Sequence, residues 1–247
     1  MQNSSFQLTR WSVVRGAAAS DPAVRQAALE RLCAQYWYPL YAYLRRQGRS
    51  PEVAADRVQG LFAHLLEGNR FGSVREGPGR FRNWLLTALQ NHERDVRDSE
   101  QALKRGGGRP PIPIDADEGE RRLELQGANT DDPAAAFERA WALETLAMAR
   151  NLLEQEQRSA GRGRVFDALI ECVTAEDEVR PRAELAAELG MSAVTLRVTL
   201  HRLRARYREL LVSVVADSLG ERAAADEELW ALAEALGAGR TERAESP

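Results

Sequence analysis

The sequence predicts an all-α fold, made of two small helical domains joined by a flexible linker. Good helix formers, above all Ala, Leu, Arg and Glu, dominate the 247 residues. Val, Ile and Thr are sparse, and no segment alternates apolar and polar residues as a half-buried strand would. Hydrophobic residues make up 44% of the chain, which is enough to fill the cores of two domains.

Changes in composition set the expected domain boundaries. The range 106–132 begins with three glycines, continues with three prolines and ends in an acidic stretch with few large apolar side chains, which is typical of a linker. We therefore expect a first domain at residues 1–105, this linker, a second domain at 133–216 and an acidic extension at 217–247.

Helix starts in the first domain are marked by a capping side chain followed by proline. Asp21-Pro22 and Ser50-Pro51 both have this pattern, because the side chain caps the first turn and proline needs no N–H there. Pro39 predicts either a kink in the first helix or the start of a new one.

The helix that starts after Ser50 has an apolar stripe with spacing i, i+3, i+4 and i+7. The stripe consists of Val58, Leu61, Phe62 and Leu65. Four glycines and a proline predict a loop at 68–79, and a further helix is expected from residue 80 to about residue 99.

Two consecutive helices in the second domain have the spacing of a helix-turn-helix. Asp132-Pro133 repeats the helix-start pattern, and a short helix is expected at 165–172. A third helix, over 183–189, ends at Gly190, whose freedom to adopt a positive φ suits a helix C-terminus. Ser192 then caps the next helix, so the two helices are joined by a short glycine turn, as in motifs that place the second helix in the DNA major groove.

The helix after Ser192 has a leucine face and a basic face when its residues are placed 100° apart. The buried face is expected to hold Leu196, Leu200, Leu203, Tyr207 and Leu210. Val194, Val198 and Ala205 lie opposite and are small enough to approach a groove. The candidate DNA-binding residues around this face are Thr195, Arg197, Val198, His201, Arg202 and Arg204.

Charge is unevenly distributed, although the net charge at pH 7 is only −3. Residues 197–208 include five arginines and no acid, whereas 115–138 and 217–245 hold eight acids each. A basic stripe between acidic segments indicates nucleic-acid binding more strongly than the whole-chain charge does. The competing interpretation is a solvated arginine-rich helix, which the glycine turn, the serine cap and the absence of acids disfavour.

Several classes of function are not indicated. Cys33 and Cys172 stand alone, which suggests a reducing compartment without disulfides. The three histidines lack the spacing of a metal site, no nucleophile–base pair predicts an enzyme, and no cofactor motif is found. With neither a signal peptide nor a long apolar run, the chain is expected in the cytoplasm and away from membranes.

The helix that begins at Pro51 resembles the polymerase-binding helix of extracytoplasmic-function (ECF) sigma factors. Its sequence over 50–62 is SPEVAADRVQGLF. That family has an acidic residue, then a glutamine three positions on, before bulky apolar residues, and Asp56, Gln59 and Phe62 match this pattern. The resemblance implies that these residues bind core RNA polymerase. Arg57 departs from the pattern, because an apolar residue is usual there.

Two other helices resemble the DNA-reading helices of the same family. The helix expected at 80–99 is similar to the one that melts the promoter and reads its minus-ten element. Contacts with the opened strand would come from one face of it, formed by Trp84, Thr87, Asn91 and Arg94. Residues 184–204 resemble the minus-thirty-five reader, in which Arg197 and Arg202 are the best candidates for duplex contacts.

The resemblance covers both expected domains in the family's order, and implies an atypical ECF sigma factor with a long linker and an acidic extension. Its partners would be core RNA polymerase and promoter DNA, with an anti-sigma factor as a further candidate. Two other interpretations stay open: a helix-turn-helix regulator that does not act with polymerase, and a helical module whose basic helix binds an acidic partner. The extension could pack on the second domain or cover its arginines.

Overall fold

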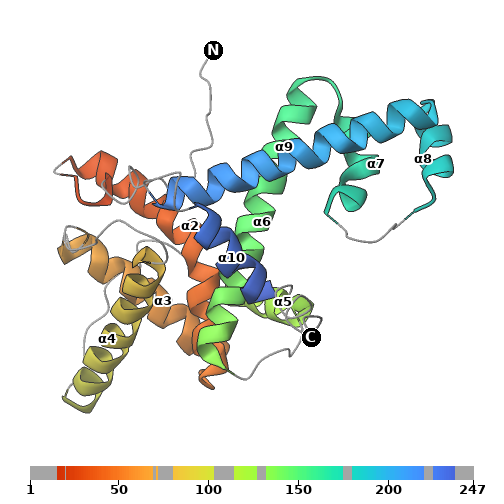
Figure 1. The fold of residues 1–247 in the computed structure, drawn as a ribbon. Helices are drawn as coiled ribbons and strands as arrows, with labels where there is room; N and C mark the ends of the chain where they lie inside the picture. The colour runs from red at the N-terminus through yellow and green to blue at the C-terminus, as the bar shows by residue number, and fades with distance from the viewer. Residues whose placement is uncertain are drawn as a thin grey trace, which may run out of the picture. The chain divides into compact units, whose positions relative to one another are not determined.

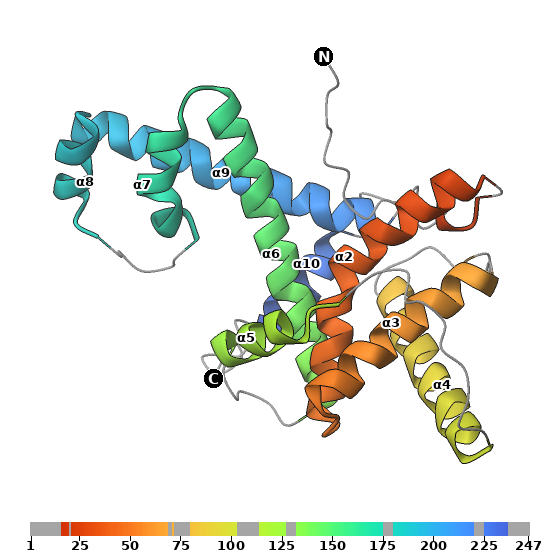
Figure 2. The same ribbon diagram turned by 180° about the vertical axis from the view of Figure 1, so that it is seen from behind.

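The computed structural model describes residues 16–19, 21–68, 71, 80–102, 114–126, 132–174, 180–219 and 225–236. These residues form helices and no strand, so the predicted all-α class is confirmed for them (Figure 1 and, from behind, Figure 2). The helices are α2 (Pro22–Arg46), α3 (Pro51–Gly68), α4 (Arg80–Ala102), α5 (Ala116–Gln126), α6 (Pro133–Ser159), α7 (Gly163–Thr174), α8 (Arg182–Leu189), α9 (Ala193–Leu219) and α10 (Ala225–Leu236). None of these described helices combines the length and apolar character needed to cross a membrane.

Three helices begin where a capping side chain precedes proline. Asp21 and Asp132 each accept a hydrogen bond from the backbone N–H two residues further on, at 2.8 and 3.0 Å. At the start of α3, Ser50 Oγ accepts a hydrogen bond from the N–H of Val53 at 3.4 Å. The predicted starts are confirmed, since each side chain satisfies an N–H that has no partner within its own helix.

Helix α2 runs through Pro39 to Arg46. A new helix at this proline, one of the two predicted outcomes, is therefore wrong. Residues 38–44 are all buried, so tertiary packing on several sides offsets the backbone hydrogen bond that proline removes. Gly48 follows with φ +83°, in the left-handed region that glycine tolerates best.

Helices α2, α3 and α4 share one hydrophobic core. The predicted stripe of α3 is confirmed, because Val58, Leu61, Phe62 and Leu65 are all buried. From α4, Phe81, Leu85 and Leu89 are buried, and the ring of Phe81 lies edge-on to Tyr36 of α2, with the ring centroids 5.1 Å apart. This core fixes which sides of α3 and α4 face solvent.

Helix α5 lies inside the range 106–132, where the sequence predicted a linker and no helix. Asp115 caps it, since its Oδ1 accepts hydrogen bonds from the N–H groups of Asp117 and Glu118 at 2.9 and 3.1 Å. The described part of α5 has only two leucines, and Leu125 is exposed. A helix with so little apolar periodicity gives no pattern to recognise.

Polar contacts hold α5 on α2. The carboxylate of Glu120 accepts hydrogen bonds from the Tyr41 hydroxyl at 2.6 Å and from Nε and Nη2 of Arg45 at 2.6 and 2.8 Å. The hydrogen bond from Arg45 is the main reason that the pKa of Glu120 is lowered. At Gly119 the backbone passes so close to Tyr41 that a Cβ would lie 2.6 Å from a ring carbon.

Helix α6 receives contacts from α4 and from α10. The guanidinium of Arg82 lies 3.6 Å from the ring centroid of Trp141, and its Nε is 3.2 Å from Glu138. At the other contact, Arg139 Nη1 donates to the carbonyl of Leu236, the last residue of α10. This contact joins α10 to the first part of α6, within one compact unit, and the two predicted roles of the acidic extension stay predictions.

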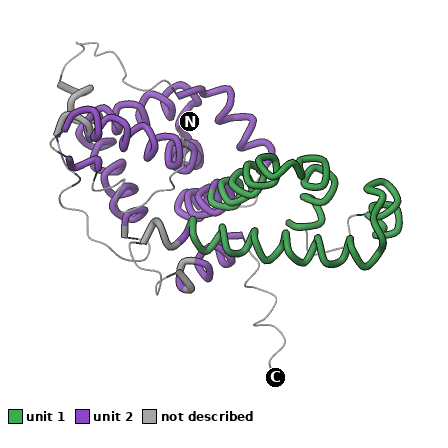
Figure 3. The backbone as a smooth tube through the Cα atoms, turned by 90° about the horizontal axis from the view of Figure 1, so that it is seen from above, with its two compact units in different colours: residues 1–6, 145–214 green, residues 7–144, 215–247 purple. Residues whose placement is uncertain are grey.

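The helices group into two compact units (Figure 3). One comprises residues 7–144 and 215–247, and the other comprises residues 1–6 and 145–214. The division falls inside α6 and α9, while the boundaries expected from composition stay a prediction. The unit that contains 145–214 has its own buried core, formed by Leu153, Phe166, Leu169, Leu185, Leu196, Leu200 and Leu203.

Candidate nucleic-acid interface

Helices α8 and α9 are joined by a turn of three residues, Gly190 to Ser192. Gly190 has φ +64°, in the left-handed region. The N–H groups of Gly190 and Met191 donate to the carbonyls of Ala187 and Ala186 at 3.2 and 2.9 Å. This Schellman arrangement satisfies the last carbonyls of α8, so the predicted glycine stop is confirmed.

Helix α9 begins with the predicted serine cap. Ser192 Oγ accepts a hydrogen bond from the N–H of Thr195 at 3.1 Å and lies 2.9 Å from its hydroxyl. The inner face is formed by the buried residues Leu196, Leu200, Leu203 and Leu210 and the half-buried Tyr207. Tyr207 donates to the carbonyl of Leu146 in α6 at 3.3 Å. These contacts fix the side that α9 presents to solvent, as the helical angles predicted.

The solvent side of α9 carries two valines between basic residues. We call Val194, Arg197, Val198, His201 and Arg202, all exposed, the outer face of α9. Val194 is 62% exposed and Val198 is 40% exposed. Within the described ranges, neither Arg197 nor Arg202 has an acidic partner. Among the residues that the structure describes, no acid therefore compensates the charge of these two arginines.

Two further arginines of α9 are bound to protein groups. Arg204, a predicted DNA-binding residue, donates from Nε and Nη2 to the carbonyl of Cys172 at 3.2 and 2.7 Å, which places it apart from the outer face. Arg206 donates to both carboxylate oxygens of Glu156, at 2.8 and 2.6 Å, and to Glu209 at 2.7 Å. The bonds to Glu156 are the main cause of the raised pKa of Arg206 and the lowered pKa of Glu156.

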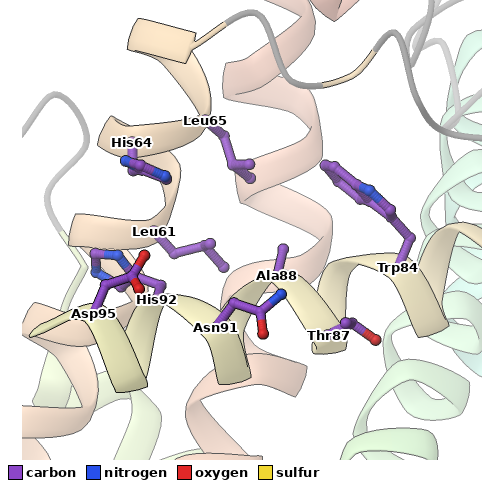
Figure 4. A pocket seen from close by; sticks show the side chains of 9 residues that line it. All are labelled: Leu61, His64, Leu65, Trp84, Thr87, Ala88, Asn91, His92 and Asp95. Carbon is purple, nitrogen blue, oxygen red and sulfur yellow. The ribbon is translucent and has the colours of Figure 1, made fainter. Parts of the chain in front are cut away.

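A pocket of about 200 Å³ opens between α3 and α4 (Figure 4). It is lined by Leu61, His64, Leu65, Trp84, Thr87, Ala88, Asn91, His92 and Asp95. Three residues predicted to face a single strand, Trp84, Thr87 and Asn91, are thus brought together. The half-buried Trp84 stacks on Phe81 and lies near Phe71, with ring centroids 5.8 and 5.3 Å apart. The pocket has an aromatic end at Trp84 and a polar end at His92 and Asp95.

The fourth predicted residue of α4, Arg94, lies beside the pocket without lining it. Its Nη1 donates to Asn91 Oδ1 at 3.3 Å, and its side chain is exposed. Thr87 donates its hydroxyl to the carbonyl of Asn83 at 2.8 Å, within its own helix. Burial is the main reason that the pKa of His92 is lowered, so this imidazole is neutral at pH 7. Of the four predicted residues, Arg94 alone carries a positive charge, and it places this charge beside the pocket.

The three predicted polymerase-binding residues of α3 do not share one environment. Asp56 is exposed and Gln59 is half-buried, on the solvent side of the helix. Phe62 is 1% exposed and belongs to the core, so its ring offers no surface to a partner in this structure. In the sequence, Phe62 fits both the apolar stripe of the core and the polymerase-binding pattern of the family, so the spacing alone does not distinguish the two roles.

An ion-pair cluster that the sequence did not predict holds α4 to α3 and to the turn between α2 and α3. The buried Glu93 lies 2.8 Å from Arg49 and 2.9 Å from Arg57. Arg57 is the residue that departs from the family pattern, and its partner on α4 gives the departure a physical reason. No local signal links these residues, because Glu93 is 44 positions from Arg49.

Neither a protein-family model, nor a curated protein, nor a solved structure matches this chain. Within the residues described, no three His, Cys, Asp or Glu side chains are grouped so that they could hold a metal ion. Both cysteines are buried, and burial raises the pKa of the Cys33 thiol to about 12. Function is therefore inferred from the side chains of α3, α4 and α9.

Proposed function

We propose that the chain is a sigma factor, which binds core RNA polymerase and directs transcription initiation at selected promoters. The observation that carries this proposal is the outer face of α9, where uncompensated arginines surround two exposed valines on a helix positioned by a capped glycine turn. Helices α8 and α9 act as a helix-turn-helix, and α9 enters the major groove.

Arg197 and Arg202 suit both kinds of contact that a duplex offers. A guanidinium donates two parallel hydrogen bonds to guanine O6 and N7, or to phosphate oxygens. Because no acid neutralises either residue within the described ranges, their full charge is available to displace counterions from DNA. His201 belongs to this face and Thr195 lies on its flank beside Arg202, so both are within reach of the phosphate backbone when α9 is in the groove.

The pocket between α3 and α4 suits one base of an opened strand. Single strands are held by stacking on aromatic rings and by arginine. Trp84 supplies an aromatic ring at one end of the pocket, Asn91 supplies an amide that can donate and accept, and Arg94 lies beside it. This second surface is what separates a sigma factor from a protein that binds only duplex DNA.

The exposed side of α3 is the surface for core polymerase. Asp56 and Glu52 are exposed there one turn apart, and Gln59 follows on the same side. Phe62 supports this surface from inside, since its packing in the core fixes the orientation of α3. A protein that binds core polymerase and promoter DNA would be located in the cytoplasm.

Transcription in vitro tests the proposal. The chain is combined with core RNA polymerase from its own source and with fragments of the genomic DNA, and discrete transcripts are expected only when both proteins are present. Asp56→Arg should abolish co-elution with core polymerase and leave duplex binding unchanged. The double variant Arg197→Ala, Arg202→Ala should do the reverse. A chain that neither co-elutes with core polymerase nor supports initiation is not a sigma factor.

The same measurements identify the two other functions that the sequence left open. Duplex binding without any binding to core polymerase would identify a helix-turn-helix regulator. Loss of binding to an acidic protein in the double arginine variant, with no DNA binding by the unaltered chain, would identify a protein-interaction module.

A further inference from the structure

The valines of the outer face are not part of the buried core. Val194 and Val198 are 62% and 40% exposed, so neither contributes much to a core. Valine is also a poorer helix former than alanine, because its branched Cβ restricts the side chain in a helix. Both residues therefore expose apolar surface to water at positions where alanine or a polar residue would stabilise α9 more.

The two valines lie between basic residues on the surface of α9. They are four residues apart on one helix, so their side chains lie on the same side, about 6 Å apart along the axis. Arg197 lies on one flank of this pair and Arg202 on the other, both exposed and without an acidic partner in the described chain. An apolar strip between uncompensated cations complements the DNA major groove, in which the base edges lie between two rows of phosphates.

The chemistry of valine restricts what it can recognise in that groove. Its side chain neither donates nor accepts a hydrogen bond, so it cannot distinguish the polar atoms of guanine, adenine or cytosine. The C5-methyl group of thymine is the apolar group on the major-groove edge of the standard bases, and 5-methylcytosine presents the same methyl group. Successive bases of a strand rise about 3.4 Å, so two valines about 6 Å apart match methyl groups about two base pairs apart.

We propose that Val194 and Val198 are specificity-determining residues that contact C5-methyl groups of two pyrimidines, about two base pairs apart. Arg197 and Arg202 contact the guanines or phosphates on either side. This inference rests on the proposed function, because it requires that α9 bind duplex DNA.

Removal of single methyl groups from the DNA tests the inference. Duplexes are first selected from a random library with the full-length chain, in the presence of core RNA polymerase. Each thymine of the enriched sequence is then replaced by deoxyuridine, which lacks only the C5-methyl group. The Kd should rise about fourfold at each of two positions, the effect of exposing one buried methyl group, and stay unchanged at the others. At these positions cytosine should bind about fourfold more weakly than 5-methylcytosine.

Protein variants then assign each methyl group to its valine. Val198→Ala should remove the difference between thymine and deoxyuridine at one of the two positions, and Val194→Ala should remove it at the other. Val24→Ala is the matched control, since Val24 is an exposed valine on α2, and it should leave both differences intact.

The possible failures are distinguishable. If duplexes are enriched but every deoxyuridine substitution leaves the Kd unchanged, the methyl contact is wrong and the proposed function stands. If the sensitivity persists in both valine variants, these valines are not the readers. If no duplex is enriched, with or without core polymerase, the proposed function fails as well.

Discussion

The arginines that join helices around the core of α2, α3 and α4 differ from those on the outer face of α9 in what neutralises them. Around the core of α2, α3 and α4, several guanidinium groups lie against carboxylates or aromatic rings. These arginines and their partners are Arg45 with Glu120, Arg49 and Arg57 with Glu93, and Arg82 with Glu138 and Trp141. On the outer face of α9, Arg197 and Arg202 are exposed and have no such partner within the described residues.

The same residue type therefore serves two purposes in this chain. An arginine held by a buried carboxylate cross-links helices, and its charge is already used within the protein. An exposed arginine without a partner keeps its charge for phosphate. Within α9, compensation thus separates Arg197 and Arg202 from Arg206. The following changes probe these arginines, the buried ion pairs and the attachment of α5.

The largest effect is expected at Glu93. Glu93→Gln removes the buried carboxylate that Arg49 and Arg57 share, and breaking a buried ion pair in this way costs about 3–5 kcal/mol of unfolding free energy. Urea denaturation followed by circular dichroism measures the loss. Glu188→Gln is the control, because Glu188 pairs with Arg180 at an exposed site and should show no measurable change. An equal loss of unfolding free energy in both variants would show that burial does not make the Glu93 ion pairs more important than the exposed Glu188 pair.

The next effect concerns DNA affinity. Arg197→Ala and Arg202→Ala should each cost about 1–3 kcal/mol of binding free energy if the residue contacts a base. If it contacts only phosphate, all sequences should bind more weakly and the salt dependence should fall by about one unit of slope. Fluorescence anisotropy at several salt concentrations distinguishes the two. Arg206→Ala is the matched variant of α9, and its affinity for DNA should change least, since Glu156 and Glu209 already neutralise it.

A smaller effect is expected at Gly119. Gly119→Ala places a methyl group against the ring of Tyr41, and we expect the attachment of α5 to weaken by about 1–2 kcal/mol, at the low end of overpacking costs because α5 can move away. Hydrogen exchange should show lower protection factors for the amides of α5. Glu124→Ala, at an exposed position of the same helix, should leave them unchanged.

The smallest effect is a pH dependence of the same attachment. The pKa of Glu120 is lowered below its ordinary value of 4.5, so its contribution is complete above about pH 4.5 and is lost as the pH falls through the folded pKa. Glu144, which pairs with Arg122 of α5, has the opposite sign, because burial raises its pKa. Glu120→Gln isolates the first contribution.

In the unaltered chain, the protection factors of the α5 amides should fall as the pH is lowered below 4.5. In Glu120→Gln this fall should be smaller, and protection at pH 7 should already be reduced. An unchanged pH profile in the variant would mean that Glu120 does not hold α5 in place.

The features that could be predicted from the sequence depend on neighbours along the chain. The caps at Asp21, Ser50 and Ser192, the glycine stop at Gly190 and the buried leucine face of α9 involve residues within a few positions of one another. Capping preference and helical period are local properties, so these elements could be placed without knowledge of the rest of the molecule.

The features that could not be predicted depend on contacts between distant residues. Glu120 is 75 positions from Arg45, and Glu156 is 50 positions from Arg206. All five arginines of residues 197–208 look alike in the sequence, and only the fold shows that Arg204 and Arg206 are bound to protein groups. The same limit explains why helix α5 was not predicted, since its contacts are with Tyr41 and Arg45, far away in the sequence.

The bond from Arg204 to the carbonyl of Cys172 has a consequence for redesign. It joins the middle of α9 to the last turn of α7, where helix carbonyls lack partners and a cation is favoured. The guanidinium of Arg204, which the sequence suggested as a DNA contact, thus helps fix the orientation of α9 relative to α7. Under the proposed function, a new specificity would be built by exchanging the outer face alone, while Arg204 is kept so that α9 stays bonded to α7.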